Sequence, residues 1–295
     1  MAGGTFGVNK SNPVNAFNGN AHTFTVVTPN YNMGQYLART IESVIRNLRP
    51  GDQYLVIDGG STDDSVEIIR SYEQHLSGWV SEADQGYADA IAKGFSRAGG
   101  EYLCWINCGD LLLDGALEEA RKYLSDSGAD MIFGDDVYID EDDKVIFRSS
   151  GRMHSLRNMM LFGGWTPLQD ACFWTRAIYE RIGGIDARLK CAADYDFFLR
   201  MSLAGRCEYV PMVFSAFRRH EGQKSIQGQQ AYKDERQRCR KSTLVKRGYS
   251  GISGLLLKSF YWLLVRLRSR VLYDRYRSMR HAGEPVQQLA CGAWE

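Results

Sequence analysis

The chain has no excess of charge of either sign. Its 295 residues include 36 Lys and Arg against 35 Asp and Glu, which leaves a formal net charge of +1. Proteins that bind nucleic acid through its phosphates need a positive surface. This balance therefore gives no reason to expect a nucleic-acid partner or a strongly acidic substrate. With 44% hydrophobic residues, the length fits one large globular domain, or one domain with appendages.

Cysteine pairs with the spacing of a zinc site are also missing. There are seven cysteines, an odd number, and Cys104 and Cys108 have no second pair to complete four ligands. Several of the seven lie in apolar runs, where a free thiol behaves as a small hydrophobic group. We therefore expect reduced thiols and a cytoplasmic protein.

The first 22 residues lack the parts of a secretory signal. The segment is rich in Gly and Asn and has neither a basic start nor an apolar stretch. We expect residues 1–22 to form a disordered arm that precedes the folded domain.

A long uninterrupted apolar run is absent too. Residues 255–272 place apolar side chains on one helical face, but Arg residues interrupt the run, which disfavours a membrane span. Between Lys233 and His281, fourteen Lys and Arg stand against three Asp and Glu. We therefore predict a basic helical extension over residues 231–295.

Two interpretations of the 255–272 helix remain open. As a basic amphipathic helix it would lie in an anionic interface, which would make the protein peripheral at the inner face of the membrane. Otherwise it would pack on the body of the protein or on a second subunit, which allows a homo-oligomer.

Strands and helices alternate through residues 23–230. Short apolar runs that end at polar turns predict strands at 23–28, 53–58, 78–81, 102–106, 130–133 and 171–173. Helical periodicity predicts helices at 35–47, 64–75, 89–97, 117–124 and 194–202. Ser61 or Thr62 is suited to cap the helix at 64–75, and Asp140–Asp143 predicts a hairpin turn. The alternation indicates an α/β domain with parallel strands and right-handed crossovers.

Asp110 is the most informative residue. It follows the apolar segment Tyr102–Ile106, so we expect it at the carboxyl end of a buried strand, where open α/β sheets bind ligands. A carboxylate there can hold a hard divalent cation, and the cation can hold a phosphate. A second acidic pair, Asp194 and Asp196, opens a predicted helix. Together these features indicate metal-assisted transfer of a group from a nucleotide.

Several short motifs occur together in a specific order and spacing. They are Thr28-Pro29-Asn30-Tyr31-Asn32, Val56-Ile57-Asp58-Gly59-Gly60-Ser61-Thr62-Asp63, Ser81-Glu82-Ala83-Asp84-Gln85-Gly86-Tyr87-Ala88-Asp89-Ala90 with Lys93-Gly94, Trp105-Ile106-Asn107-Cys108-Gly109-Asp110, Gly183-Gly184-Ile185-Asp186, Ala193-Asp194-Tyr195-Asp196-Phe197-Phe198-Leu199-Arg200 and Arg218-Arg219-His220. The chain from Thr25 to about Ser225 therefore resembles family 2 of the glycosyltransferases. The resemblance implies a glycosyltransferase A fold, with a mixed, mostly parallel sheet flanked by helices.

The resemblance also implies a metal-dependent scheme. Asp110 would hold Mn²⁺ or Mg²⁺, which neutralises the leaving nucleoside diphosphate. His220 would complete the metal shell or contact the diphosphate, although a lone His is equally often structural. The residues that would bind the nucleotide-sugar donor, expected to be a UDP-sugar, are Thr28, Pro29 and Tyr31 at the nucleoside, Asp58 and Asp63 at the base or ribose, and Asp84, Asp89, Lys93 and Asn107. Asp63 has an alternative role as a helix cap.

The chain departs from the family pattern at two positions. The family often has two adjacent acidic residues where Gly109 and Asp110 stand, and the first is associated with the ribose. Asn107 or main-chain groups would have to replace it. The family also often has Asn where Ala92 stands. These departures affect the nucleotide contacts and leave the metal-binding aspartate in place.

By the same resemblance, Asp194 is the general base that removes the proton of the acceptor hydroxyl. Direct displacement with one base inverts the anomeric centre. The alternative is that Asp194 only caps its helix. We expect Asp196 to support the base and Arg200 to pair with a carboxylate. Less specific candidates are Trp165, Gln169 and Asp170 on the acceptor side, and Asp135 and Asp136, which reach a substrate or else belong to a turn.

Two other functions compete with this interpretation. A nucleotidyltransferase shares a nucleotide-binding α/β core but needs a basic, Gly-rich phosphate loop, and residues 28–34 contain no Lys or Arg. A non-catalytic nucleotide-sugar-binding module is favoured by Gly109 and disfavoured by the presence of both Asp110 and Asp194. We therefore expect an inverting, metal-dependent glycosyltransferase whose acceptor is a glycan or a lipid-linked glycan.

Overall fold

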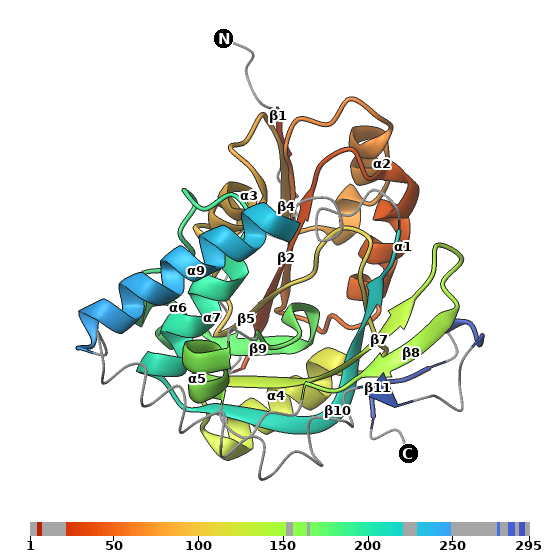
Figure 1. Cartoon of the computed structure of the whole chain (residues 1–295). Helices are drawn as coiled ribbons and strands as arrows, with labels where there is room; N and C mark the ends of the chain where they lie inside the picture. Colours follow the sequence, from red (N-terminus) through yellow and green to blue (C-terminus); the bar gives the residue numbers. More distant parts are fainter. Residues whose placement is uncertain are drawn as a thin grey trace.

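The fold was obtained as a computed structural model of the whole chain (Figure 1). It describes residues 5–7, 22–151, 156–163, 166–220, 229–248, 276–277, 283–286 and 289–292. Two sequence predictions, the acceptor-side role of Trp165 and the amphipathic helix at 255–272, lie outside these residues.

One mixed sheet organises the described chain. Its strands are β1 (Thr5–Gly7), β2 (Phe24–Asn30), β3 (Gln53–Asp58), β4 (Gly78–Ser81), β5 (Tyr102–Trp105), β6 (Leu111–Leu112), β7 (Met131–Ile139), β8 (Val145–Ser149), β9 (Cys172–Thr175), β10 (Cys207–Arg218) and β11 (Tyr276–Arg277). The order across the sheet is β1-β4-β3-β2-β5-β9-β7-β10-β6, with β8 paired to β7 and β11 to β8.

The neighbouring strands β4, β3, β2 and β5 are parallel, as the alternation predicted. Their residues are buried except for Ser81, which is half-buried. Burial of both strand faces is typical of a parallel sheet covered by helices on both sides. The remaining strands make the sheet mixed, because β9 runs antiparallel between β5 and β7, and β10 runs parallel to β7.

Helices cover the two sides of this sheet. They are α1 (Gly34–Ile45), α2 (Ser65–Ser71), α3 (Tyr87–Phe95), α4 (Ala116–Ser127), α5 (Leu156–Asn158), α6 (Arg176–Arg181), α7 (Ala193–Ala204) and α9 (Gln229–Lys246), with the short helices η1 (Glu73–His75), η2 (Met159–Gly163) and η3 (Gln169–Ala171). Figure 1 shows α1 and α2 on one side of the parallel strands and α3, α6, α7 and α9 on the other. The helix predicted at about 64–75 is confirmed as helical chain, but it consists of two pieces, because α2 ends at Ser71 and η1 follows.

Helix α3 packs closely on the parallel strands because it contains a glycine at the contact. A Cβ on Gly94 would lie 2.4 Å from Cγ1 of Val27 and 3.3 Å from Cγ1 of Ile57. Any side chain at this position would push α3 away from β2 and β3. The motif that ends with Gly94 thus has a packing reason besides any role in binding.

The hairpin predicted around Asp140–Asp143 is confirmed, since β7 and β8 pair antiparallel on either side of it. Within the turn, Oδ1 of Asp140 accepts hydrogen bonds from the amides of Asp142 (3.0 Å) and Lys144 (2.8 Å). The strand that was expected to end at residue 133 continues to Ile139. Asp135 and Asp136 therefore belong to a buried strand, and their predicted turn role is wrong.

Both predicted appendages include described residues that contact the body. Strand β1 pairs antiparallel with β4, and α9 lies against α7 and η2. The domain boundaries after residues 22 and 230 stay predictions. Among the residues that the structure describes, none of the helices combines the length and hydropathy that a membrane crossing needs.

Candidate active site

The carboxyl ends of β2, β3 and β4 meet at the carboxylate of Asp58. Its Oδ1 accepts hydrogen bonds from the side chains of Asn30 (2.7 Å) and Ser61 (2.5 Å). Its Oδ2 accepts from Oγ of Ser81 (2.7 Å) and from the amides of Gly60 (3.1 Å) and Ser61 (2.9 Å). Asp58 is fully buried. This residue, predicted to meet the base or ribose, thus uses its oxygens to hold three strand ends together.

An open aromatic surface lies beside Asp58. Tyr31 follows β2 and is 58% exposed. Asp84 and Tyr31 both lie close to Gly59, which has no side chain. A Cβ at this position would lie 2.5 Å from Oδ2 of Asp84 and 3.3 Å from Cδ2 of Tyr31. The other oxygen of Asp84 accepts from the Gly86 amide at 2.8 Å. An exposed ring beside a carboxylate can stack on a nucleobase while the carboxylate accepts a hydrogen bond from base or ribose.

Thr28 and Pro29 are buried in β2. Oγ1 of Thr28 lies 3.0 Å from the hydroxyl of Tyr54, and both residues are inaccessible to solvent. Of the three residues predicted to line the nucleoside, Tyr31 is thus the one whose side chain is exposed.

Asp63 lies between the starts of two helices. Its Oδ2 accepts from the Gly34 amide at the start of α1 (2.8 Å), and its Oδ1 from the Ser65 amide at the start of α2 (3.1 Å). Burial favours a higher pKa for Asp63, but these hydrogen bonds outweigh it and hold the pKa below its usual value. The predicted cap by Ser61 or Thr62 is wrong, since neither side chain caps α2. The alternative role of Asp63, in which its side chain caps a helix start, agrees with these two contacts.

Lys93 is surrounded by carboxylates of its own motif. Its Nζ lies 3.0 Å from Oε1 of Glu82 and 3.4 Å from Oδ2 of Asp89. Burial favours a lower pKa for Lys93, but the two carboxylates outweigh it and raise the pKa. Asp89 also accepts from the amide of Gln85 at 3.0 Å. These contacts tie the start of α3 to the loop that carries Asp84.

Asp110 lies at the predicted strand tip within a polar cluster. Its Oδ2 accepts from Nδ2 of Asn107 at 3.4 Å, and the same amide group donates to Oε1 of Gln169 at 2.6 Å. Gln169 donates in turn to the carbonyl of Trp105 at 2.7 Å. The structure therefore brings together three residues that were predicted separately: Asp110, Asn107 and Gln169.

Asp170, on η3, brings a second carboxylate to this cluster. Its Oδ2 is buried and has no hydrogen-bond partner among the residues described. Burial raises the pKa of Asp170 to about 6. Burial also raises the pKa of Asp110 well above its usual range, and the nearby charge of Asp170 adds to that effect. Two buried carboxylates that oppose each other's ionisation are suited to receive a cation.

The cluster fits a divalent cation that is shared with a diphosphate. Magnesium-like ions are usually held by one or two carboxylates together with substrate phosphates, without a cage made of protein alone. The described part of the chain contains no group of three or more His, Cys, Asp or Glu side chains placed to hold a metal. Asp110 and Asp170 would supply hard oxygen ligands, and Asn107 an amide oxygen.

His220, the second predicted metal ligand, lies next to Tyr36, with the ring centroids 5.5 Å apart. Burial lowers the pKa of His220, so the neutral imidazole prevails at neutral pH and can ligate a metal. Within the described residues His220 does not form a three-residue group with Asp110 and Asp170. Its role at the metal or diphosphate stays a prediction.

Arg218, to which the sequence analysis gave no role of its own, fixes the turn that holds Asp110. Its amide donates to Oδ1 of Asp110 at 3.0 Å, and its Nε donates to the carbonyl of Gly109 at 2.9 Å. Its guanidinium is buried, lies 4.8 Å from the ring centroid of Tyr36 and donates to the carbonyl of Asp140 at 2.8 Å. A charged residue directly after the mostly apolar run 210–217 was the available sequence signal.

Asp194 lies on the first turn of α7, as predicted. The cap position is Ala192, and Oδ1 of Asp194 is buried without a hydrogen-bond partner among the described residues. Burial raises the pKa of Asp194 to about 6. Tyr87 from α3 and Tyr232 from α9 lie near enough to feel its charge. A half-buried carboxylate with one buried, unused oxygen and a pKa near neutrality can accept a proton.

The predicted pairing of Arg200 with a carboxylate is confirmed. Its Nε donates to Oδ2 of Asp196 at 2.7 Å. Its Nη1 donates to the carbonyls of Ile182 (2.8 Å) and Gly184 (2.7 Å). Asp196 thus helps to join α7 to the turn after α6, which agrees with a supporting role.

Asp135 is enclosed by donors of the protein. Its Oδ2 pairs with Arg148 at 2.6 Å, and its Oδ1 accepts from Ser150 (3.0 Å), the Gly151 amide (2.8 Å) and the Tyr209 hydroxyl (2.9 Å). The residue is fully buried. These contacts give Asp135 a structural function and leave it poorly suited to reach a substrate.

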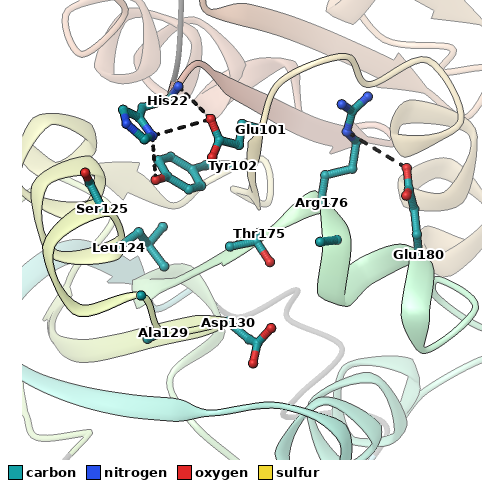
Figure 2. A pocket seen from close by; sticks show the side chains of 12 residues that line it. His22, Glu101, Tyr102, Leu124, Ser125, Ala129, Asp130, Thr175, Arg176 and Glu180 are labelled. Atoms are coloured by element: carbon teal, nitrogen blue, oxygen red, sulfur yellow. Dashed lines mark hydrogen bonds and ion pairs between the residues drawn. The ribbon is translucent and has the colours of Figure 1, made fainter.

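A separate hollow of about 480 Å³ opens at the amino end of β5. Figure 2 shows His22, Glu101 and Tyr102 gathered at one side of it. Nδ1 of His22 lies 2.8 Å from the Tyr102 hydroxyl and 3.4 Å from Oε2 of Glu101. Asp130 and Arg176 also line it. None of the predicted site residues does, so this hollow is distinct from the candidate active site.

A model of glycosyl transferase family 2 matches residues 25–183, more than half of the chain. The chain belongs to glycosyl transferase family 2. It is accordingly a glycosyltransferase. The matched segment ends before α7, so it includes Asp110 and Asp170 but neither Asp194 nor His220.

Curated relatives carry the same designation. The chain is 31% identical over 195 residues to an uncharacterized glycosyltransferase of Mycobacterium tuberculosis, covering 64% of this chain and 72% of the relative. It is 25% identical over 189 residues to the PGL/p-HBAD biosynthesis glycosyltransferase of Mycobacterium bovis, covering 61% of this chain and 70% of that protein.

Solved structures share the fold. The TarS fragment 1–349 of Staphylococcus aureus in complex with UDP-GlcNAc has a TM-score of 0.56 at 18% identity, and the match covers 68% of this chain and 60% of TarS. The mannosyltransferase PcManGT of Pyrobaculum calidifontis, in complex with GDP-Man and Mn²⁺, has a TM-score of 0.57 at 17% identity, with 77% and 65% covered. The predicted glycosyltransferase A fold is confirmed.

Proposed function

We propose that the protein is an inverting, metal-dependent glycosyltransferase that moves a sugar from a nucleotide sugar to a hydroxyl of a glycan or lipid-linked glycan. The observation that carries the proposal is the buried, unpartnered Oδ1 of Asp194. The clustered carboxylates of Asp110 and Asp170 at the tip of β5 support it.

The donor is a UDP-sugar, with its nucleoside at Tyr31 and Asp84. Tyr31 offers an exposed ring, and the missing side chain at Gly59 lets Asp84 lie close beside that ring. TarS, which shares the fold, binds UDP and UDP-GlcNAc, whereas PcManGT binds GDP-Man. Asp58 and Asp63 act indirectly, because they hold the loops around this surface. Asp89 and Lys93 act in the same way through the loop before α3.

Asp110 and Asp170 would hold the cation, which we expect to be Mn²⁺ or Mg²⁺. When bound, it supplies Lewis-acid neutralisation of the charge that develops on the leaving diphosphate. Asn107 and Gln169 orient the Asp110 carboxylate through their hydrogen bonds. The amide of Arg218 keeps the same carboxylate in place from the other side.

Asp194 accepts the proton of the acceptor hydroxyl as its oxygen attacks the anomeric carbon. Because the pKa of Asp194 is about 6, the carboxylate is ionised at neutral pH and can act as a base. One base and one displacement invert the anomeric centre, in contrast to schemes with two carboxylates and a covalent intermediate.

The loop before α3 connects the donor surface with the base. Its Asp84 borders Tyr31 and Gly59. Three residues later, the hydroxyl of Tyr87 accepts from the Ala193 amide at 2.9 Å. Lys190, four residues before Asp194, donates from Nζ to the carbonyl of Gln85 at 2.6 Å. These contacts support a common location for the donor surface and the base.

The acceptor reaches the protein at the inner face of the membrane, where the segment 255–272, predicted from its sequence to be an amphipathic helix, would hold the enzyme peripherally. Each Lys or Arg near an anionic surface contributes about 1 kcal/mol. Removal of residues after 250 should therefore reduce co-sedimentation with anionic vesicles and leave donor turnover intact. Unchanged co-sedimentation would favour the packing interpretation, in which the helix contacts the body or a second subunit.

Donor turnover is the direct test. UDP- and GDP-sugars are incubated with the protein with and without Mn²⁺, and release of nucleoside diphosphate is measured. We expect metal-dependent release of UDP. Release of pyrophosphate would indicate a nucleotidyltransferase instead. Binding of UDP-sugars without turnover would indicate a non-catalytic module, the alternative that Gly109 favours.

A further inference from the structure

Helix α9 lies next to the start of α7, beyond the segment that defines the family match. Figure 1 shows α9 running alongside α7 on the same side of the sheet. Most residues of α9 are exposed or half-buried, as expected of a basic surface helix, but Glu235 is buried, at 8% exposure. A buried carboxylate in a polar helix needs partners that compensate for its loss of water.

The partners of Glu235 are three consecutive backbone amides. Its Oε2 accepts from the amides of Lys190 (3.1 Å), Cys191 (2.7 Å) and Ala192 (2.7 Å). Successive amides that converge on one anion form a concave binding site. Burial favours a higher pKa for Glu235, but these bonds outweigh it and hold the pKa below its usual value. The carboxylate is thus ionised at neutral pH and fixes the backbone of 190–192.

Tyr87 holds the same turn from the other side. Its hydroxyl donates to the carbonyl of Cys191 at 3.0 Å and accepts from the amide of Ala193 at 2.9 Å. The segment 190–193 is therefore clamped between α3 and α9. Asp194 is the next residue of the chain, so the clamp determines where its carboxylate lies.

Arg236 follows Glu235 and lies near the same carboxylate. Its guanidinium carbon lies 5.6 Å from the ring centroid of Tyr232 and 6.0 Å from that of Tyr195. The positive charge of Arg236 lowers the pKa of Asp194, which burial raises, and the negative charge of Glu235 acts in the opposite sense. Among the residues that the structure describes, Tyr87 from α3, and Tyr232, Glu235 and Arg236 from α9, are titratable or charged groups that interact with Asp194.

We infer that α9 is part of the catalytic unit: Glu235 is a positioning residue that fixes the 190–193 turn and so orients Asp194, and Arg236 sets the electrostatic field at its carboxylate. The inference rests on the proposed role of Asp194 as the base. A purely structural role for Glu235 would change the melting temperature and leave the kinetic constants of the folded enzyme unchanged.

The test compares Glu235→Gln with Asp234→Asn in the full chain. Both remove one negative charge from α9, but Asp234 is exposed and its carboxylate accepts only from Gln230 among the hydrogen bonds found. With a UDP-sugar that the wild type hydrolyses in the presence of Mn²⁺, Glu235→Gln should lower kcat by roughly tenfold to hundredfold, because displacement of a reacting group by about 1 Å can cost that much. KM for the donor and the affinity for UDP should stay within about twofold, and Asp234→Asn should behave as wild type.

Arg236→Gln provides an independent measurement should Glu235→Gln fail to fold. Loss of the cation should move the acid limb of the kcat–pH profile upward by roughly half to one unit, as expected for an opposite charge removed from a carboxylate. Arg236→Lys keeps the charge and should restore most of the wild-type profile.

Two results would overturn the inference while leaving the proposed function intact. One is a kcat for folded Glu235→Gln within about twofold of wild type, and the other is an acid limb that Arg236→Gln does not move. A wild-type protein that consumes no nucleotide sugar refutes the proposed function first, before any variant is made, and the inference falls with it.

Discussion

At the amino end of the central strands, the buried carboxylate of Asp52 faces the buried guanidinium of Arg121 at 2.8 Å. The remaining bonds to Asp52 come from the amides of Phe24 (2.8 Å) and Arg49 (2.9 Å). At the carboxyl end, Asp170 and Asp194 each keep a buried oxygen without a partner among the described residues. The carboxylate at the amino end is thus compensated, whereas the carboxyl end carries two carboxylates with an unused oxygen beside the fully hydrogen-bonded Asp58.

The difference separates groups that hold the fold from groups that act on a ligand. A buried ion pair with further hydrogen bonds satisfies each charge, and loss of one partner is strongly destabilising. A buried carboxylate without a partner raises the free energy of the folded protein, and such groups cluster at functional sites. Substitutions of the paired residues at the amino end should therefore lower the stability of the protein. Substitutions of Asp170 or Asp194 at the carboxyl end should lower its activity.

Asp194→Asn should give the largest effect on activity. Asn is nearly isosteric but cannot accept a proton, and loss of a general base typically lowers the rate about 10²–10⁴-fold. Sugar transfer or donor hydrolysis should fall by this amount. UDP affinity should stay unchanged, and the melting temperature at neutral pH should hold or rise because Asn carries no charge. Asp196→Asn is the matched control and should retain most activity. If Asp196→Asn is inactive and Asp194→Asn is active, Asp196 and not Asp194 is the base. If both variants are active, Asp170 is the next candidate.

Arg121→Met should give the largest effect on stability. It leaves Asp52 buried and charged without its partner, which typically costs about 3–5 kcal/mol in the free energy of unfolding. Urea denaturation measures this, and turnover per folded molecule should be unchanged. Arg188→Gln breaks a pair with Asp186 in which Arg188 is 90% exposed, and should leave the free energy of unfolding nearly unchanged because water screens the pair. Equal costs for the two variants would contradict the comparison.

Asp110→Asn should reduce the affinity for UDP at least about tenfold in the presence of Mn²⁺, because an amide is a poorer ligand than a carboxylate for a hard cation. Affinity without metal should change little, and titration calorimetry can measure both. Because the substitution also removes the repulsion between Asp110 and Asp170, the melting temperature should hold or rise. If wild type and variant bind UDP equally well in the presence of Mn²⁺, Asp110 does not bind the metal.

Activity and stability should respond to pH in opposite directions. The pKa of Asp194 is about 6 when folded and near 3.9 in an unfolded chain, so the folded state binds the proton more tightly. Its contribution to stability is present below about pH 4 and is lost as pH rises to about 6, with a slope of at most about 1.4 kcal/mol per pH unit. Turnover should rise over the same interval as the base ionises. Comparison with Asp194→Asn in urea titrations at pH 4 to 7 isolates this contribution.

Local sequence features predicted the parts of the site that lie at strand tips and helix starts. Asp110 follows an apolar run, Asp194 opens a helix, and Arg200 lies four residues after Asp196, within reach on one helical face. The alternation of strands and helices predicted the parallel core. These features depend on neighbours along the chain, which a sequence displays directly.

Contacts between distant segments could not be predicted in the same way. Asp170 meets Asp110 because β9 inserts antiparallel beside β5, and no local pattern reveals that register. Thr28 is buried against Tyr54, which the sequence did not predict. Both faces of a parallel strand are buried, so no alternation of polar and apolar residues distinguishes them. Glu235 is buried in a helix with no apolar stripe, and its partners lie more than forty residues earlier.

The five hydrogen bonds at Asp58 have a consequence for local motion. They tie loops after residues 30, 58 and 81 to one buried anion, so these loops cannot open separately without leaving that anion unsatisfied. The amides of Gly60 and Ser61, although they lie outside any strand, should therefore exchange with deuterium on the timescale of the strand core. A nucleoside would then meet loops that are already ordered, and binding would require little further loss of conformational entropy.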